Sequence, residues 1–248
     1  MTERQDTQKA NPTGFDLSAY GAIVDTLRRS GYEIVDYDRL NPAQPHLVLR
    51  HDVDFDLGTA VAMAEFEASR GFQAIYFVLV RTEFYNVFTI RGTDAVRRIR
   101  ALGHEVGLHF DAAQYPLSET NFPEAVARES DLLERATDSA VRTVTFHRPG
   151  AVDIDYHFEI PRRINEYSWR GQKEMGYCSD SQGTWRYGHP LDHPAVSTSR
   201  ALELLTHPLW WANTAANDPI KKLTAFLERR RDFLDREIAA NCLIYRSK

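Results

Sequence analysis

The sequence predicts an α/β fold made of parallel β/α units. Three observations favour this class. Short apolar segments alternate with amphipathic helical segments, several apolar segments end in a histidine or an aspartate, and the length of 248 residues suits one α/β barrel. The first residues are polar, so we expect a disordered lead-in over residues 1–14 and a single domain over residues 15–248.

Helices and strands are expected to alternate from residue 16 to residue 240. Each expected helix has apolar residues at helical spacing, and each expected strand is short and rich in β-branched or aromatic residues. In chain order they are helix 16–30 (stopped by Gly31), strand 46–52, helix 57–70 (capped by Asp56 and stopped by Gly71), strand 74–80, helix 93–102 (stopped by Gly103), strand 105–110, helix 123–136, strands 141–146, 175–178 and 202–206, and helix 219–240. The last helix is expected to bury a stripe formed by Ile220, Leu223, Leu227, Leu234 and Ile238.

The composition disfavours nucleic acid and membrane partners. Apolar residues make up 43% and charged residues 26% of the chain, and the net charge is −5. This composition excludes a disordered chain, and the lack of an apolar run of about 18 residues excludes a membrane span. The acidic balance disfavours nucleic acid. Because the N-terminus lacks the apolar core of a signal peptide, we expect a cytoplasmic protein in which Cys178 and Cys242 are free thiols.

Polar residues follow four of the expected strands at the point where each strand ends. They are the segments 50–54 (RHDVD), 109–111 (HFD), 147–150 (HRPG) and 207–208 (HP). The carboxyl ends of parallel strands lie at one edge of the sheet, where α/β proteins bind their ligands. We therefore expect these four segments to form one site.

Asp52, Asp54 and His109 are candidates for metal-assisted chemistry. Strand alternation places Asp52 and Asp54 on the same side, and two neighbouring carboxylates require a cation or a shared proton. One of them can bind a metal while the other acts as a base. His109 lies at a strand tip, where a metal ligand is expected, whereas alternation points His104 the other way, into packing.

The later strand ends offer further candidates. Either His147 or Arg148 is expected to face the pocket, and an arginine beside a carboxylate would keep that carboxylate ionised. His207 is suited to protonate a leaving amine. Trp185 and Trp210 are candidate substrate-binding residues that form an apolar wall or stack on a sugar, although core packing is the commoner role of a single tryptophan.

Five segments, in this order, resemble the motifs of the polysaccharide deacetylase family, also called the NodB-homology family or carbohydrate esterase family 4. They are 50–54 (RHDVD), 103–109 (GHEVGLH), 146–150 (FHRPG), 179–185 (SDSQGTW) and 205–207 (LTH), and the resemblance covers about residues 47–211. It implies a distorted (β/α) barrel with about seven parallel strands, a divalent metal with zinc as the expected ion, and hydrolysis of an N-acetyl amide, usually on a sugar.

Carried over to this sequence, the resemblance makes Asp52 the general base, Asp54 the aspartate ligand and His109 the first histidine ligand. The two aspartates are separated by Val53, so their roles can be swapped. The family's second ligand histidine corresponds to Ala113 here. The candidates for the missing ligand, in order of preference, are His147, Asp111 and Glu105, since imidazole is the usual zinc ligand.

The expected function is therefore that of a metal-dependent N-deacetylase acting on a glycan or a small sugar-linked precursor. In this mechanism Arg148 orients Asp52, and Asp180 orients His207 and raises its pKa. Trp185 closes the wall around the acyl methyl group. The alternatives are a catalytically inactive barrel that binds a glycan or a protein, and a deformylase or esterase of the same fold.

Overall fold

The computed structural model describes residues 14–170, 174–213 and 217–246. The strands are β1 (Glu33–Ile34), β2 (His46–Val53), β3 (Ile75–Leu79), β4 (Glu105–Phe110), β5 (Thr143–Phe146), β6 (Ile164–Asn165), β7 (Gly176–Ser179) and β8 (Leu202–Thr206). The helices are α1 (Leu17–Arg29), α2 (Leu57–Ser69), α3 (Ile90–Ala101), α4 (Phe122–Thr137), α5 (Glu166–Arg170), α6 (Pro194–Ser197), α7 (Pro208–Trp211) and α8 (Pro219–Asn241). Residues 1–13 of the expected lead-in lie outside the described residues.

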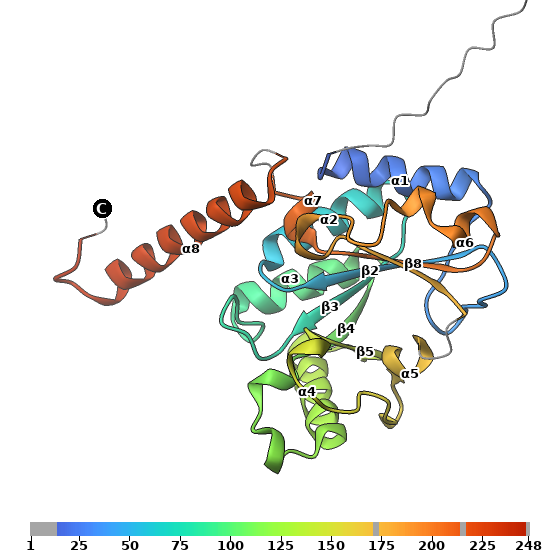
Figure 1. Cartoon of the computed structure of the whole chain (residues 1–248). Coiled ribbons are helices and arrows are strands. Elements are labelled where there is room, and N and C mark those ends of the chain that lie inside the picture. Colours follow the sequence, from blue (N-terminus) through green and yellow to red (C-terminus); the bar gives the residue numbers. More distant parts are fainter. Residues whose placement is uncertain (1–13, 171–173, 214–216, 247–248) are drawn as a thin grey trace, which may run out of the picture.

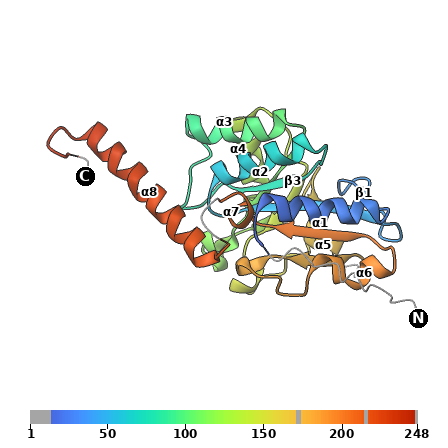
Figure 2. The same ribbon diagram turned by 90° about the horizontal axis from the view of Figure 1, so that it is seen from above.

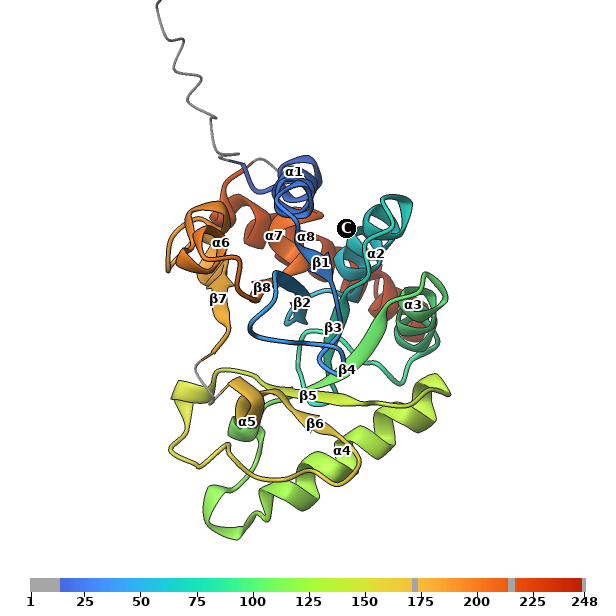
Figure 3. The same ribbon diagram turned by 90° about the vertical axis from the view of Figure 1, so that its right-hand side faces the viewer.

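The strands form one parallel sheet that curls into an open half-barrel (Figure 1). Its order is β6-β5-β4-β3-β2-β8-β7, and β1 pairs with β2 beside this path. Viewed along the sheet, the strands follow an arc with helices around it (Figure 3). The expected distorted (β/α) barrel with about seven parallel strands is confirmed. The two-residue strands β1 and β6 were not expected, because they are too short to show a period of two.

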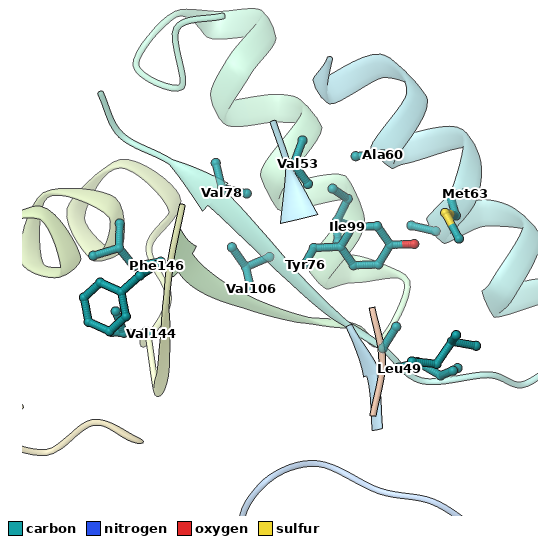
Figure 4. Close-up of a cluster of buried hydrophobic side chains, with 14 of the residues drawn as sticks. Leu49, Val53, Ala60, Met63, Tyr76, Val78, Ile99, Val106, Val144 and Phe146 are labelled. Atoms are coloured by element: carbon teal, nitrogen blue, oxygen red, sulfur yellow. The ribbon is translucent and has the colours of Figure 1, made fainter. Parts of the chain in front are cut away.

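The sheet separates two apolar layers. On the outer face, Val53, Val78 and Val106 pack towards Met63 of α2 and Ile99 of α3 (Figure 4). On the inner face, a smaller cluster fills the barrel, formed by Val35, Tyr37, Val48, Ile75 and Phe77. Because side chains alternate along β2, the residues that continue the inner face towards the carboxyl end are Arg50 and Asp52. The barrel interior is therefore apolar at one end and charged at the other.

Two local expectations about the strand ends are confirmed. The carboxylate of Asp56 accepts a hydrogen bond from the Gly58 amide at 2.9 Å and caps α2, so it is used in the turn that follows β2. His104 is buried, and its ring contacts the backbone of Ala64 and Ala74 on the outer side of the sheet. Cys178 and Cys242 are free thiols.

The expected buried stripe of the last helix is wrong at four of its five residues, whereas Leu223 is half-buried and packs against the core. Ile220, Leu227, Leu234 and Ile238 are 73%, 60%, 47% and 48% exposed, respectively. The helix is instead held through its other face, where Phe226 and Lys222 are buried. Beyond these first turns α8 projects away from the rest of the molecule (Figure 2), so its apolar stripe has no sheet to pack against.

Among the described residues, no helix is both long enough and apolar enough to cross a bilayer.

Candidate metal centre and active site

The carboxyl ends of four strands bring the polar segments together at one edge of the sheet. Asp54 follows β2, His109 lies in β4, His147 follows β5 and His207 follows β8. These strands are neighbours, or separated by one strand, in the parallel sheet. Since parallel register aligns their ends, residues up to about 150 positions apart in the chain meet at one place. The expectation of a single site is met by this geometry.

Asp54, His109 and His147 form a triangle of potential ligand atoms. The Oδ1 atom of Asp54 lies 3.4 Å from Nε2 of His109 and 3.3 Å from Nδ1 of His147, and the two nitrogens are 3.2 Å apart. Ligands at about 2.0–2.1 Å from a tetrahedral zinc ion are about 3.3 Å from one another. The three sides of the triangle match that spacing, so these residues fit a zinc ion.

The surroundings of the triangle also suit a cation. Oδ1 of Asp54 is buried and, among the described residues, has no hydrogen-bond partner, which is an unfavourable state for a carboxylate oxygen unless a cation binds it. Burial opposes ionisation of Asp54, but its contacts with His109 and His147 and the charge of His207 outweigh burial and lower the pKa of the carboxyl group. Asp54 is therefore held as an anion.

Thr145 orients the buried candidate ligand His109. The two residues are paired across β4 and β5, and the Thr145 hydroxyl lies 2.8 Å from Nδ1 of His109. This contact occupies one ring nitrogen and leaves Nε2 facing Asp54. Gly107 lies two residues earlier on the same face, where an added Cβ would be 2.4 Å from the ring of Phe77. The absence of a side chain at Gly107 therefore leaves room for this phenyl ring.

Arg50, rather than Arg148, holds Asp52. Nε and Nη2 of Arg50 donate hydrogen bonds to the two carboxylate oxygens of Asp52 at 2.9 and 2.8 Å. Burial disfavours the ionised form of Asp52, yet the charge and hydrogen bonds of Arg50, together with the charges of His109 and His207, outweigh burial and lower the pKa of the carboxyl group. The expectation that Arg148 orients Asp52 is wrong, because Nη2 of Arg148 donates to Asp111 at 2.6 Å. Arg148 has a left-handed backbone with φ 47°, which turns its side chain away from the path of β5.

His207 is paired with Asp180, as expected. Nδ1 of His207 lies 2.5 Å from Oδ1 of Asp180, and the His207 amide donates to Oδ2 at 3.0 Å. The indole of Trp211 donates to the same Oδ2 at 2.6 Å. Burial alone would lower the pKa of His207, but Asp180, with smaller contributions from Asp54 and Asp52, outweighs burial and raises that pKa to about 9. Nε2 of His207 lies 3.6 Å from Oδ2 of Asp54. The imidazole of His207 therefore points at the triangle of potential ligand atoms.

The other candidate ligands lie elsewhere. Asp111 accepts the hydrogen bond from Arg148, and Glu105 lies at the start of β4, where it pairs with Arg142 at 2.7 Å. Glu105 is thus at the opposite end of the strand from His109. Of the three residues considered for the missing ligand, His147 is the one that joins Asp54 and His109.

Trp185 and Trp210 pack in an aromatic layer instead of lining the hollow at the site. The ring centre of Trp185 lies 5.7 Å from that of Trp211 and 5.9 Å from that of Phe15. Trp210 is only 5% exposed, and its ring centre lies 6.3 Å from that of Phe55. The small hollow over the site is lined by other residues, namely Asp52, Val53, Asp54, Phe55, Asp56, Thr59, His207, Pro208 and Leu209. Trp185 and Trp210 do not line this described hollow, and their role in substrate binding stays a prediction.

Sequence reasoning missed three residues that support the site: Arg50, Thr145 and Trp211. Arg50 carried a usable signal, because it lies two residues before Asp52 on one strand and so shares its face. Thr145 and Trp211 had no such signal. The role of Thr145 depends on the pairing of β4 with β5. The role of Trp211 depends on the position of α7, which brings the indole to Asp180.

The comparisons with known proteins found similar structures but no matching family model or curated sequence. A carbohydrate esterase family 4 pseudoenzyme from Bacillus anthracis matches with 15% identity and a TM-score of 0.40, over 76% of this chain and 63% of that chain. The chitin deacetylase of Colletotrichum lindemuthianum matches with 16% identity and a TM-score of 0.41, over 80% and 86% of the two chains. The deacetylase PplD of Streptococcus pyogenes matches with 11% identity and a TM-score of 0.42, over 90% and 92%.

The Bacillus anthracis pseudoenzyme belongs to the family that the five sequence segments resemble. The chain spans less than two thirds of the length of the Bacillus pseudoenzyme.

Proposed function

We propose that this chain is a metal-dependent amide hydrolase that removes an N-acetyl group from a sugar or a sugar-linked precursor. The observation that carries the proposal is the triangle of Asp54, His109 and His147, with Asp52 beside His109 and His207 beside Asp54. A zinc ion bound by that triangle supplies Lewis-acid polarisation of the substrate carbonyl and a lowered pKa for the attacking water.

Asp52 is the proposed general base. Its Oδ2 lies 3.6 Å from Nε2 of His109, so it borders the triangle without belonging to it. The two hydrogen bonds from Arg50 keep the carboxylate ionised and fix its orientation, and it can therefore accept a proton from the attacking water. This geometry favours Asp54 as the ligand and Asp52 as the base over the swapped assignment.

His207 is the proposed general acid. An amide nitrogen is a poor leaving group until it is protonated, and His207 holds a proton at neutral pH because Asp180 raises its pKa to about 9. The contact of Asp180 with Nδ1 leaves Nε2 as the atom that delivers the proton. Asp180 acts through His207 and is a positioning residue.

The experiment combines metal analysis with product detection. We expect the purified protein to bind one zinc ion and to release acetate from N-acetylated sugars. His109→Ala should lose the metal, whereas His207→Asn should keep the metal and lose turnover. His157→Ala is the matched control, because the side chain of His157 is 57% exposed and lies outside the cluster. Unchanged metal content in His109→Ala would contradict the proposal.

The same assay separates the alternatives. A protein that binds metal and releases formate, or that cleaves only esters, would be a deformylase or an esterase of this fold. A protein with neither bound metal nor any hydrolysis would be an inactive binding barrel.

A further inference from the structure

A groove runs between α8 and the edge of the molecule formed by α2, α3 and the loop before α3. It encloses about 760 Å³. One wall is the face of α8 that carries Phe226, Arg229 and Phe233, and the opposite wall includes Phe84 and Arg91. The mechanism proposed above uses none of these residues.

The groove opens beside the candidate active site. Phe55, Asp56 and Thr59 line both the groove and the small hollow that contains Asp54 and His207. The groove and the hollow therefore adjoin and share one wall, so the groove lies next to the atoms proposed to carry out the reaction.

The groove is basic, although the whole protein is acidic. Four arginines line it, namely Arg91, Arg229, Arg230 and Arg236, against the two acids Asp56 and Asp232. Both acids have partners, since Asp56 contacts Arg229 at 3.5 Å and Asp232 contacts Arg231 at 2.9 Å. Within the described part of the chain, no carboxylate lies within 4.0 Å of Arg91, Arg230 or Arg236. Three uncompensated guanidinium groups in a protein of net charge −5 indicate an anionic ligand.

Aromatic rings line part of the groove, and one of them contacts two of its arginine side chains. The guanidinium carbons of Arg91 and Arg230 lie 4.8 and 5.4 Å from the ring centre of Phe233. These two arginines come from different helices and stack on one ring, so their donors are partly ordered before a ligand arrives. A second aromatic group, Phe55 with Phe84 at 4.9 Å, lies towards the active site. The groove thus offers an apolar surface beside several guanidinium donors.

We propose that this groove binds a phosphate ester in the substrate, so that the amide cleaved belongs to an N-acetylated sugar joined through phosphate to an apolar or aromatic group. This inference rests on the proposed function and specifies its substrate class. Guanidinium groups bind phosphate through paired, charge-assisted hydrogen bonds, and the phenyl rings cover the attached group. That group is either a nucleoside or a lipid chain, since both bring the same phosphate chemistry.

Binding of defined probes to the full-length, zinc-loaded protein tests the proposal by calorimetry. The probes are N-acetylglucosamine, its 1-phosphate, its uridine diphosphate ester and its farnesyl diphosphate ester. We expect the 1-phosphate to bind at least about tenfold more tightly than the neutral sugar, with an advantage that shrinks as salt screens the charges. The tighter of the two diphosphate esters identifies the attached group. Equal affinity for the neutral sugar and its 1-phosphate would overturn the proposal.

Charge-removing variants locate the binding. Arg91→Gln combined with Arg236→Gln should weaken binding of the 1-phosphate about a hundredfold, or about tenfold for each guanidinium. The matching double lysine variant keeps the charges and should retain most of the affinity. Arg231→Gln is the control, because Arg231 lies on the same helix but does not line the groove. An equal loss in Arg231→Gln and in the double glutamine variant would refute the assignment to the groove.

Acetate release distinguishes this inference from the proposed function. Tight, arginine-dependent binding of the phosphate esters without acetate release would support the groove and refute deacetylation. Acetate release with the same kcat/KM from the neutral and phosphorylated sugars would support deacetylation and refute the groove.

Discussion

Removing the Arg50 charge is expected to destabilise the protein and to reverse the way its stability depends on pH. The Arg50 side chain is buried and contacts three carboxylates. It holds Asp52 at 2.9 and 2.8 Å and reaches Glu166 and Glu203 at 3.1 Å each. All three acids lie inside the barrel, where water cannot replace the guanidinium. Arg50→Met fills a similar volume without the charge.

The size of the effect follows from these contacts. A pair of unit charges about 4 Å apart interacts with about 4 kcal/mol at an effective dielectric constant of about 20, before the cost of desolvation. Breaking a buried ion pair by removing one partner typically costs about 3–5 kcal/mol, because a buried charge is left uncompensated. Domains of this kind are stable by about 5–15 kcal/mol, so Arg50→Met is expected to lose about a fifth of the total or more.

The pH dependence gives the sharper test. In the native protein the pKa of Asp52 is lowered, so its contribution to stability is present above the unfolded-state pKa and is lost as pH falls through the folded-state value. Without Arg50, burial raises the pKa of the interior acids above their unfolded values. The free energy of unfolding of the Arg50→Met variant should therefore rise as pH falls from about 7.5 to about 5.5. In the native protein Asp52 contributes no such rise over the same pH range.

Urea unfolding at the two pH values measures both effects. Arg142→Met is the matched control, since Arg142 pairs with Glu105 but has a side chain that is 53% exposed, and its loss should cost less than about 1 kcal/mol. Arg50→Lys keeps a charge but not the two-pronged contact with Asp52, which provides a folded variant for the activity assay. Its kcat should fall about tenfold, because the base is less well oriented. If Arg50→Met unfolds at the same urea concentration as the control at both pH values, the reasoning is refuted.

Three further predictions concern the active site. Asp180→Asn should move the alkaline limb of the kcat profile to lower pH, because without that carboxylate the raised pKa of His207, about 9, falls; an unshifted limb would exclude His207 as the titrating acid. Thr145→Val removes the hydroxyl that orients His109 and should weaken zinc binding about 10–100-fold in a competition assay with a chelator, with unchanged affinity as the opposing result. Gly107→Ala places a Cβ 2.4 Å from an aromatic ring carbon and should cost about 1–3 kcal/mol of unfolding free energy, visible as a lower Tm; an unchanged Tm would show that the ring can move aside.

The local patterns of the sequence were sufficient for the main elements and for the cluster of strand ends. Helix and strand periods, the cap at Asp56 and the polar residues after β2, β4, β5 and β8 are properties of short segments. They could be found without knowing what each segment packs against. Once the strands were expected to be parallel, the meeting of Asp54, His109 and His207 at one edge followed from geometry.

The sequence by itself thus determined which segments fold into strands and helices and which strand ends carry the reactive groups. Only the tertiary structure decided which partner each group has. From the sequence, either Arg50 or Arg148 could have contacted Asp52. In the structure Arg50 contacts Asp52, whereas Arg148, which has a left-handed backbone, donates to Asp111. The apolar stripe of α8 was expected to be buried, but burial requires a surface to pack against, and Ile220, Leu227, Leu234 and Ile238 are largely exposed. Periodicity describes a face of one element, whereas pairing and burial depend on a second element that the local pattern does not contain.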